Sequence, residues 1–285
     1  MESLDEGRLL LGGLAFPEGP RWRQGQLWFT DQHAHEVVRV DLEGRRDTVV
    51  ANMDDRPGGL GFLPDGTPLV VSMQARQVLR ITPSGLELHA DLSALASFHC
   101  NDMLVDDQGR AYVGNFGYDL DAGEAPRPAE IILLQPDGQA RIVSQDEVIF
   151  PNGMALTPDR QTLVVAETFG ARIGAFDVLS DGSLSGYRIW ADLDGAQPDG
   201  LCLDAEGAVW FACTRSGRVY RVTAEGHEVA YAQPRTTPYA CMLCGPERRH
   251  LAVLCSTTHV PEEAARLRTG TIEVFPVEVP GAGLP

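Results

Sequence analysis

Six copies of a short motif place oxygen-bearing side chains at one repeated position of the chain. The second residue of the motif is glutamate, aspartate or asparagine in four copies, and the six occupants are Glu18, Gly58, Asn101, Asn152, Asp199 and Tyr239. Carboxylate and amide oxygens are the ligands that hard divalent cations prefer. The pattern therefore predicts a cation site assembled from segments that lie far apart in the sequence.

The two carboxylates of this set, Glu18 and Asp199, should approach each other if the copies converge. Buried carboxylates in one place are unfavourable unless one is protonated or a cation binds both. The asparagines favour coordination, because an amide oxygen can bind a cation but cannot act as an acid or a base. The alternative is that Asn152-Gly153 and Asp199-Gly200 only form turns, as such pairs often do.

The motif introduces a repeat that spans nearly the whole chain. Each copy leads into short stretches rich in Val, Ile, Leu and aromatic residues, separated by turn signals such as Pro64-Asp65-Gly66. The copies start roughly 40 to 50 residues apart, at Pro17, Pro57, Cys100, Pro151, Pro198 and Pro238. This period is typical of a four-stranded propeller blade.

The repeat predicts an all-β fold, a six-bladed β-propeller of four-stranded antiparallel blades with the metal site at one mouth of the central channel. The chain, residues 1–285, is expected to be a single domain. The apolar strand at 8–11 is expected to join the last blade and to close the ring, which would leave no exposed edge. Only the stretch at 261–266 has a helical pattern.

The loops between second and third strands should surround the metal site, because antiparallel strands return these loops to the same mouth. They supply the candidate substrate-binding residues His33, Tyr118, Phe169, Arg215 and His259. A mixed aromatic and polar lining is typical of small-molecule sites. The longer loops at 117–127 and 258–269 are candidate lids over such a pocket.

The composition excludes several chemistries. The 23 basic residues are all arginine and stand against 40 acidic residues, for a net charge of −17. Without lysine the chain can form no Schiff base, cannot attach pyridoxal phosphate and has no lysine-containing phosphate loop. The acidity argues against nucleic-acid and anionic-membrane partners. A small-molecule substrate is expected, and no obligate protein partner is evident.

Targeting signals and metal-binding cysteine pairs are also missing from the sequence pattern. No run of about 18 apolar residues is present, and residues 1–6 lack the basic-then-apolar order of a signal peptide. We expect a cytoplasmic protein with six reduced cysteines. Cys241 and Cys244 form a C-x-x-C pair, but no second pair or histidine cluster follows at zinc-binding spacing.

Taken in order, the motifs resemble those of the senescence marker protein (regucalcin), gluconolactonase and luciferin-regenerating enzyme family. The resemblance covers essentially the whole chain, with PEGPRW at 17–22, NDMLVDDQGRAYVG at 101–114, PNGMAL at 151–156, PDGLCLD at 198–204 and YACMLCGPE at 239–247. It implies a six-bladed propeller with one divalent cation. Calcium is the first expectation, and zinc, manganese and magnesium are the alternatives.

The resemblance also implies roles for individual residues. It implies that Glu18, Asn152 and Asp199 are metal ligands, and that Asn101 contacts substrate or, as in diisopropyl-fluorophosphatase-like propellers, the metal. It implies hydrolysis of lactones, often sugar lactones, with phosphotriesters as side substrates. Sugar-lactone members usually carry an arginine two residues before the asparagine, whereas this chain has His99. A less hydroxylated or more apolar lactone, or another ester, is therefore expected.

The working hypothesis is metal-assisted hydrolysis. The cation would polarise the substrate carbonyl, Asp199 would activate water as a base or, as a second option, act as a nucleophile, and Asn101 would assist. His99 would contact substrate. Two alternatives stay open, since fold does not determine function. The protein could be a non-catalytic metal- or ligand-binding propeller, or a lyase or isomerase that uses the same cation.

Overall fold

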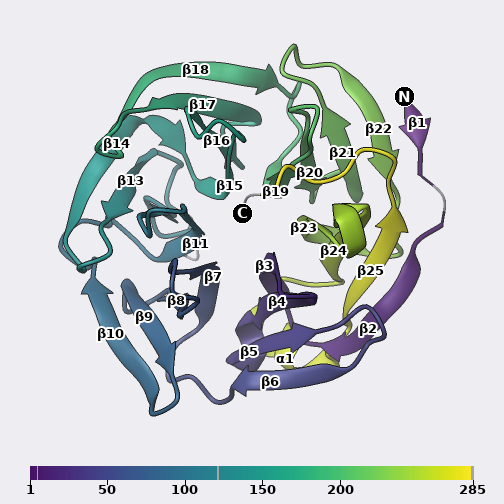
Figure 1. Cartoon of the computed structure of the whole chain (residues 1–285), viewed down its shortest axis with the longest axis horizontal. Coiled ribbons are helices and arrows are strands. Elements are labelled where there is room, and N and C mark those ends of the chain that lie inside the picture. The colour runs from purple at the N-terminus through teal and green to yellow at the C-terminus, as the bar shows by residue number, and fades with distance from the viewer. Residues whose placement is uncertain (5, 121, 284–285) are drawn as a thin grey trace.

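The strands form a ring of sheets around a central axis (Figure 1). The structure, a computed structural model, describes residues 1–4, 6–120 and 122–283, without the side chains of 145–147. Within these residues the strands form six sheets, each with four antiparallel strands in its blade. The predicted six-bladed, all-β propeller is confirmed.

The first three blades follow one another in chain order. They contain β3 (Pro17–Arg23), β4 (Gln26–Asp31), β5 (Glu36–Val40) and β6 (Arg46–Val50); β7 (Pro57–Phe62), β8 (Pro68–Ser72), β9 (Gln77–Thr82) and β10 (Gly85–Asp91); and β11 (Cys100–Val105), β12 (Ala111–Asn115), β13 (Pro128–Leu134) and β14 (Ala140–Ile149). In each blade the first strand lies nearest the axis (Figure 1).

The last three blades repeat this order and close the ring. They contain β15 (Pro151–Leu156), β16 (Thr162–Glu167), β17 (Arg172–Val178) and β18 (Leu184–Asp192); β19 (Pro198–Leu203), β20 (Val209–Cys213), β21 (Arg218–Val222) and β22 (Glu228–Ala232); and β23 (Thr237–Cys244), β24 (His250–Ser256), β25 (Gly270–Pro276) and β2 (Arg8–Leu14). The N-terminal strand β2 pairs with β25, so the predicted closure is confirmed. A two-residue strand, β1 (Glu2–Ser3), also pairs in parallel with β22.

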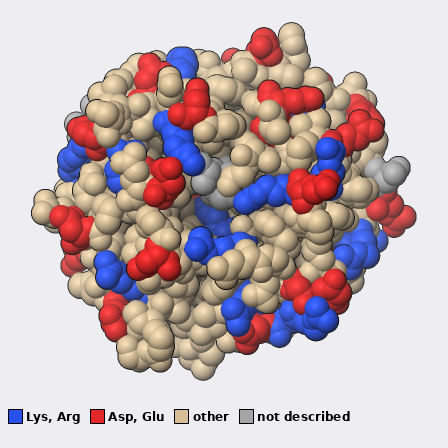
Figure 2. Space-filling model, viewed as in Figure 1, with Lys and Arg blue, Asp and Glu red and all other residues tan. Residues whose placement is uncertain are grey.

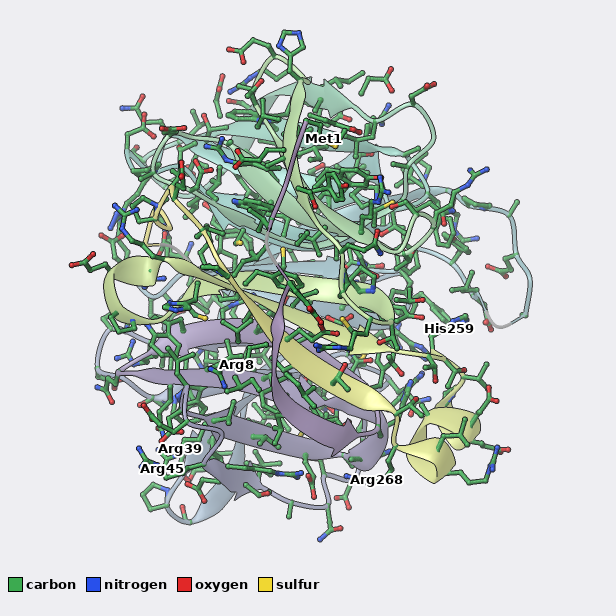
Figure 3. All side chains as sticks on the ribbon, turned by 90° about the vertical axis from the view of Figure 1, so that its right-hand side faces the viewer. Met1, Arg8, Arg39, Arg45, His259 and Arg268 are labelled. Carbon is green, nitrogen blue, oxygen red and sulfur yellow. The ribbon has the colours of Figure 1, made fainter. Side chains whose placement is uncertain are left out.

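The two faces of the ring carry different loops. We call the face where the inner strands begin the motif face, and the face where they turn into the second strands the turn face. Figures 1 and 2 look onto the turn face, where Gly281 near the C-terminus bridges to Asp204. Figure 3 shows the ring from its side, with His259 on the motif face and Arg45 on the turn face.

One loop of the motif face forms a helix. The segment α1 (Pro261–Leu267) lies between β24 and β25, where the sequence predicts helix, and it packs against the 3-10 turn η1 (Gln32–Ala34) of the first blade. Proline in its first turn and the acidic pair Glu262 and Glu263 suit a helix N-terminus. The helix therefore covers part of the motif face beside His33.

Every inner strand is irregular at the repeated motif. Its pairing with the second strand shifts register there, as a β-bulge does, and the shifts fall between Glu18 and Arg21, Pro57 and Leu60, Cys100 and Met103, Pro151 and Met154, Pro198 and Leu201, and Pro238 and Ala240. A bulge re-aims a side chain out of the regular alternation of the strand. The same device thus recurs at every motif position around the axis.

The glycines of the motif are needed for packing between neighbouring inner strands. A Cβ on Gly153 would lie 2.4 Å from the Leu201 nitrogen, and one on Gly200 would lie 2.6 Å from the Ala240 Cβ. Gly153 and Gly200 lie inside β15 and β19, outside the left-handed region of φ. The alternative that Asn152-Gly153 and Asp199-Gly200 only form turns is therefore wrong.

The apolar residues and the cysteines behave as the composition predicts. Buried Val, Leu, Ile and Phe side chains fill the spaces between adjacent blades. All six cysteines are buried and, among the described residues, none forms a disulfide. In the same part of the chain, no helix is long and apolar enough to cross a membrane.

Candidate active site

Two carboxylates from opposite parts of the sequence influence each other at the motif face. Glu18 lies on β3 and Asp199 on β19, and the side chain of Asp199 is 8% exposed. Burial raises the pKa of Glu18 well above its usual value, and repulsion by Asp199 raises it further. Burial likewise raises the pKa of Asp199 to about 8. The structure thus brings together the two acidic residues that the repeat singles out.

The hydrogen bonds around this pair come from neutral donors. The Gly19 amide donates to the Glu18 carboxylate at 3.1 Å, and the Asn152 side chain donates to Asp199 and partly offsets the rise in its pKa. In the described ranges no arginine forms a salt bridge with Glu18 or Asp199. Their charges are therefore left without a cationic partner.

The asparagines differ in how they are held. Asn152 donates from Nδ2 to Thr168 Oγ1 at 3.2 Å, and the Thr168 hydroxyl donates to the Pro198 carbonyl at 2.8 Å. These bonds place the amide nitrogen toward Thr168 and leave the amide oxygen available. Asn101 is 9% exposed, and its Nδ2 has no hydrogen-bond partner among the described residues. A buried unpaired amide of this kind needs a partner from a ligand or water.

A third carboxylate, that of Asp102, also acts on Glu18 and Asp199, but it forms a salt bridge with an arginine. Arg21 donates from Nη2 to Asp102 Oδ1 at 2.9 Å and to the main-chain carbonyl of Met103. Arg21 and Asp102 meet across the second blade. A side chain at Gly59 would obstruct this contact, because its Cβ would lie 2.5 Å from Asp102 Oδ1. Arg21 thus has a carboxylate partner in Asp102, although its charge also lowers the pKa of Glu18.

These features fit a divalent cation. Glu18, Asp199, Asn152 and Asn101 offer hard oxygen donors. Half-buried Glu18 and buried Asp199 form no salt bridge in the described part of the chain, so both gain from a cation. Within the described ranges no three His, Cys, Asp or Glu side chains gather as a metal-binding group. A cation at this place would therefore draw its remaining protein ligands from amide oxygens, as the sequence predicts.

Aromatic side chains near Asn101 and Asn152 in the sequence form a series of ring contacts, which we call the aromatic wall. The ring of His99 stacks on Phe98 with centroids 4.1 Å apart, and the ring of Phe150 stacks on Phe116 at 4.5 Å. Phe150 also contacts Phe169 at 4.9 Å. Phe169 is 36% exposed, so one end of the wall faces solvent.

The predicted residue Tyr118 belongs to the same wall. Its ring lies 5.9 Å from Phe150 and 6.2 Å from Phe169. The hydroxyl is buried and, within the described part of the chain, has no hydrogen-bond partner, and burial raises its pKa. The third and fourth blades thus bring His99, Tyr118 and Phe169 into one aromatic cluster.

His33 lies on the other side, beneath the loop that leads into α1. Its ring stacks on Phe16 at 4.9 Å, and Phe16 contacts Tyr239 at 4.6 Å. The Nε2 atom of His33 lies 3.1 Å from the His259 carbonyl. Burial lowers the pKa of His33 to about 4, so the imidazole is neutral at neutral pH.

The other two predicted pocket residues lie nearer the surface. The His259 side chain is exposed, and its main-chain carbonyl rather than its imidazole contacts His33 (Figure 3). Arg215 is exposed and donates to the Gly195 carbonyl at 3.3 Å. Both residues lie in loops of the motif face, outside the aromatic contacts of the wall.

Phe16 and Phe150 belong to the site but are absent from the residues that the loop pattern predicts. Phe16, His99 and Phe150 each stand two residues before an oxygen-bearing motif residue, and each makes a ring contact. This shared offset is a signal in the sequence that identifies both phenylalanines. Arg21 and Thr168 carry no comparable signal, because their partners come from other blades or strands.

Comparisons with known proteins found similar sequences and similar structures. The family model described as "SMP-30/Gluconolactonase/LRE-like region" matches residues 16–257. Regucalcin of Xenopus laevis is 28% identical over 255 residues, which cover 86% of this chain and 85% of the relative. The family model spans every motif residue of the candidate site.

Two solved structures are similar across the whole ring. One, described as a calcium-binding protein, regucalcin, from Agrobacterium tumefaciens, has a TM-score of 0.83 at 22% identity and covers 100% of this chain and 97% of its own. The other, described as a gluconolactonase from Xanthomonas campestris, has a TM-score of 0.74 at 21% identity and covers 99% and 91%. At these identities the structural likeness establishes the fold.

Proposed function

The chain belongs to the SMP-30/gluconolactonase/LRE-like family, and from this membership we propose that it is a divalent-metal-dependent hydrolase that opens a lactone or a related ester. Family membership supports a lactonase-type hydrolase. The metal dependence is supported by one observation above all. Half-buried Glu18 and buried Asp199 repel each other beside neutral amides, and in the described part of the chain neither forms a salt bridge.

Glu18, Asn152 and Asp199 would hold the cation, and Asn101 would supply a fourth oxygen or a substrate contact. A bound divalent cation supplies Lewis-acid polarisation of a carbonyl and compensates negative charge that develops on its oxygen. Calcium is our first expectation, because every donor is a hard oxygen. Zinc, manganese and magnesium remain alternatives for the same donor set.

The side chains of the chain have separate tasks in this reaction. Asp199 would accept a proton from the attacking water, and the hydrogen bond from Asn152 would orient its carboxylate. Asn101 would donate from its unpaired Nδ2 to a substrate oxygen. Neutral His33 donates from Nε2 to the His259 carbonyl, so its unpaired Nδ1 can accept a hydrogen bond without adding charge.

The aromatic wall favours an apolar substrate. The series from Phe98 through Phe150 to Phe169 offers ring faces and edges but few hydrogen-bond donors. Apolar walls bind apolar surface, whereas a polyhydroxylated sugar would leave its hydroxyls unpaired against them. An aryl-fused or alkyl-substituted lactone is therefore the substrate class we propose, with the solvent-facing Phe169 at the open end.

A lactone panel tests this function. We expect the purified protein to open an aryl-fused δ-lactone with a higher kcat/KM than a polyhydroxylated sugar δ-lactone, as measured by pH-indicator titration. Chelator should stop both reactions, and an added divalent cation should restore them. In H₂¹⁸O the product should carry one ¹⁸O.

The same panel separates the alternatives. A product without added water would contradict hydrolysis and favour a lyase or isomerase. Saturable binding of the lactone without turnover would favour a non-catalytic binding propeller. Turnover that survives exhaustive chelation would contradict the metal dependence.

A further inference from the structure

A second site of the molecule lies at the opposite mouth of the ring. A cavity of about 920 Å³ opens on the turn face, between the ends of the inner strands of the first three blades and the connection from β23 to β24. Figure 2 shows a hollow near the centre of this face with arginine side chains around it. The cavity lies away from Asn101, Asn152 and Asp199, none of which lines it.

The lining of this cavity is less acidic than the chain as a whole, because its three arginines match its three carboxylates in number. Arg21, Arg23 and Arg248 line it, although the chain carries a net charge of −17. The guanidinium of Arg23 lies over the Phe62 ring at 4.7 Å. Within the described residues, neither Arg23 nor Arg248 forms a side-chain hydrogen bond or a salt bridge, although the charge of Arg23 contributes to lowering the pKa of Asp65.

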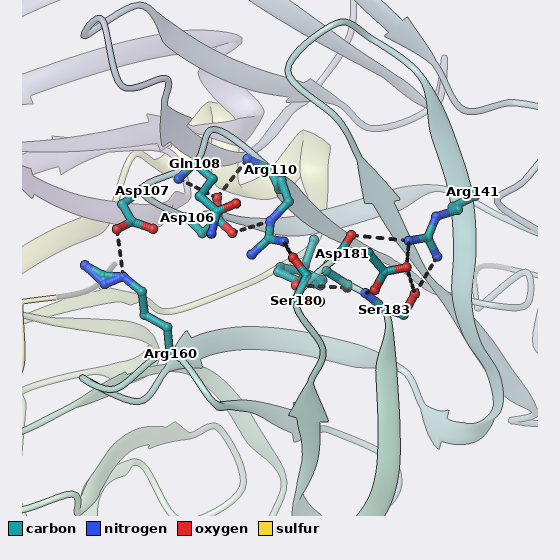
Figure 4. Close-up of polar contacts among 11 residues, drawn as sticks. Asp106, Asp107, Gln108, Arg110, Arg141, Arg160, Ser180, Asp181 and Ser183 are labelled. Carbon is teal, nitrogen blue, oxygen red and sulfur yellow. Dashed lines mark hydrogen bonds and ion pairs between the residues drawn. The ribbon is translucent and has the colours of Figure 1, made fainter.

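The acidic residues of the lining are engaged elsewhere. Asp106 accepts from Arg110 at 2.7 Å, and Asp107 pairs with Arg160 at 3.0 Å (Figure 4). Glu247 lies 3.5 Å from Arg249. Each of these carboxylates has a cationic partner outside the lining, and Arg21 pairs with Asp102, so among the described residues Arg23 and Arg248 are the arginines of the lining without a salt bridge.

Arg21 adds a buried donor that has no partner. This side chain is 5% exposed, donates from Nη1 to the Pro20 carbonyl at 2.7 Å and from Nη2 to Asp102. Its Nε is buried and has no hydrogen-bond partner among the described residues. A buried N–H of a guanidinium strongly favours an oxygen acceptor, and the cavity that Arg21 lines is where one can bind.

The segment that carries Arg248 has a strained backbone. Glu247 and Arg248 have φ angles of 56° and 54°, in the left-handed region that non-glycine residues rarely adopt. The Gly281 amide donates to the Arg248 carbonyl at 3.0 Å and fixes this conformation. Burial also lowers the pKa of the Arg248 guanidinium, since it gives up water without gaining a carboxylate.

Apolar surface adjoins the turn-face cavity. A second hollow of about 340 Å³ shares Trp22 and Gly245 with it and is also lined by Leu42 and Pro246. A ligand could therefore place a charged group among the arginines and an apolar part along Trp22. Oxyanions such as phosphate and carboxylate match the planar donor pattern of arginine.

We propose that the turn-face cavity binds a small organic anion, with its phosphate or carboxylate group held by Arg21, Arg23 and Arg248 and its apolar part against Trp22 and Phe62. This site does not depend on the hydrolase function, because none of Glu18, Asn101, Asn152 and Asp199 lines the cavity.

Phenyl phosphate and benzoate test the proposal, with neutral benzyl alcohol as the uncharged control. Binding to the full chain is measured by calorimetry and by tryptophan fluorescence, with and without chelator. We expect at least one anion to bind saturably in both conditions and benzyl alcohol not to bind. The anion with the lower Kd shows whether the cavity prefers a phosphate or a carboxylate group.

Three matched variants locate the site. Arg248→Gln and Arg23→Gln should each raise the Kd at least about tenfold, as expected for a lost charge-assisted hydrogen bond. Arg266→Gln should leave it unchanged, because Arg266 is exposed on α1 of the motif face. Two independent variants keep the test valid if circular dichroism shows that one of them does not fold.

Three outcomes would overturn the proposal. The proposal is wrong if neither anion binds saturably, if all three variants bind with the Kd of the parent chain, or if binding disappears on chelation. The last result would assign the anion to the metal site of the motif face instead.

Discussion

Replacing Asp199 with asparagine is expected to abolish lactone hydrolysis even when divalent cation saturates the protein. Asparagine keeps the shape of the side chain and an oxygen donor, but it cannot accept a proton from water. Loss of a general base typically lowers kcat by about 10²- to 10⁴-fold. The measurement is kcat at saturating cation, with cation occupancy followed by calorimetry.

The control for this substitution is Asp194→Asn. Asp194 is exposed on the loop before β19 and has a positive φ of 48°, which asparagine tolerates. The Asp194→Asn substitution also removes one carboxylate charge near β19, and it should leave kcat unchanged. Full activity of Asp199→Asn at saturating cation would rule out Asp199 as the base.

Replacing Glu18 with glutamine is expected to weaken cation binding by roughly 100-fold or more, since affinity at oxygen sites follows the number of charged ligands. Unlike Asp199→Asn, this variant keeps the proposed base. Its activity should therefore return as the cation concentration is raised. The measurement is the cation concentration that gives half-maximal kcat.

The same variant makes a second, opposite prediction for stability in chelator. Burial and repulsion by Asp199 penalise ionised Glu18 in the folded state. The penalty grows as pH rises above the usual value of 4.5, so it is present at neutral pH. Without cation, Glu18→Gln should thus melt at or above the parent Tm, yet gain less from added cation.

Glu228→Gln is the matched control, because Glu228 is exposed on β22. It should change neither the cation affinity nor the Tm. A Glu18→Gln variant that binds cation as tightly as this control would contradict the assignment of Glu18 as a ligand.

The architecture could be predicted from the sequence because its determinants are local and repeated. The apolar stretches, the turn signals and the motif recur in each copy, so the blade number and the closure by β2 follow from counting. The convergence of Glu18 and Asp199 follows from the same symmetry, since equivalent positions of a ring face a common axis. The role of Gly153 and Gly200 does not follow from this symmetry, because it depends on how closely neighbouring inner strands pack.

Contacts that skip a blade could not be predicted. Arg21 reaches Asp102 only because the glycines of the second blade leave room between them, and no local pattern indicates that approach. The position of His259 depends on the path of the loop into α1, which presents a carbonyl to His33 and turns the imidazole outward. Both depend on the three-dimensional arrangement of segments rather than on spacing along the chain.

A crystal structure of the protein grown with a divalent cation, with an anomalous difference map, would test the proposed metal site without relying on any substrate. We expect one strong peak at the motif face, in contact with the side-chain oxygens of Glu18, Asn152 and Asp199, at about 2.3–2.6 Å if the cation is calcium. A map without a peak among these three side chains, from crystals of protein that is active as a lactonase, would show that hydrolysis does not use a cation at this site.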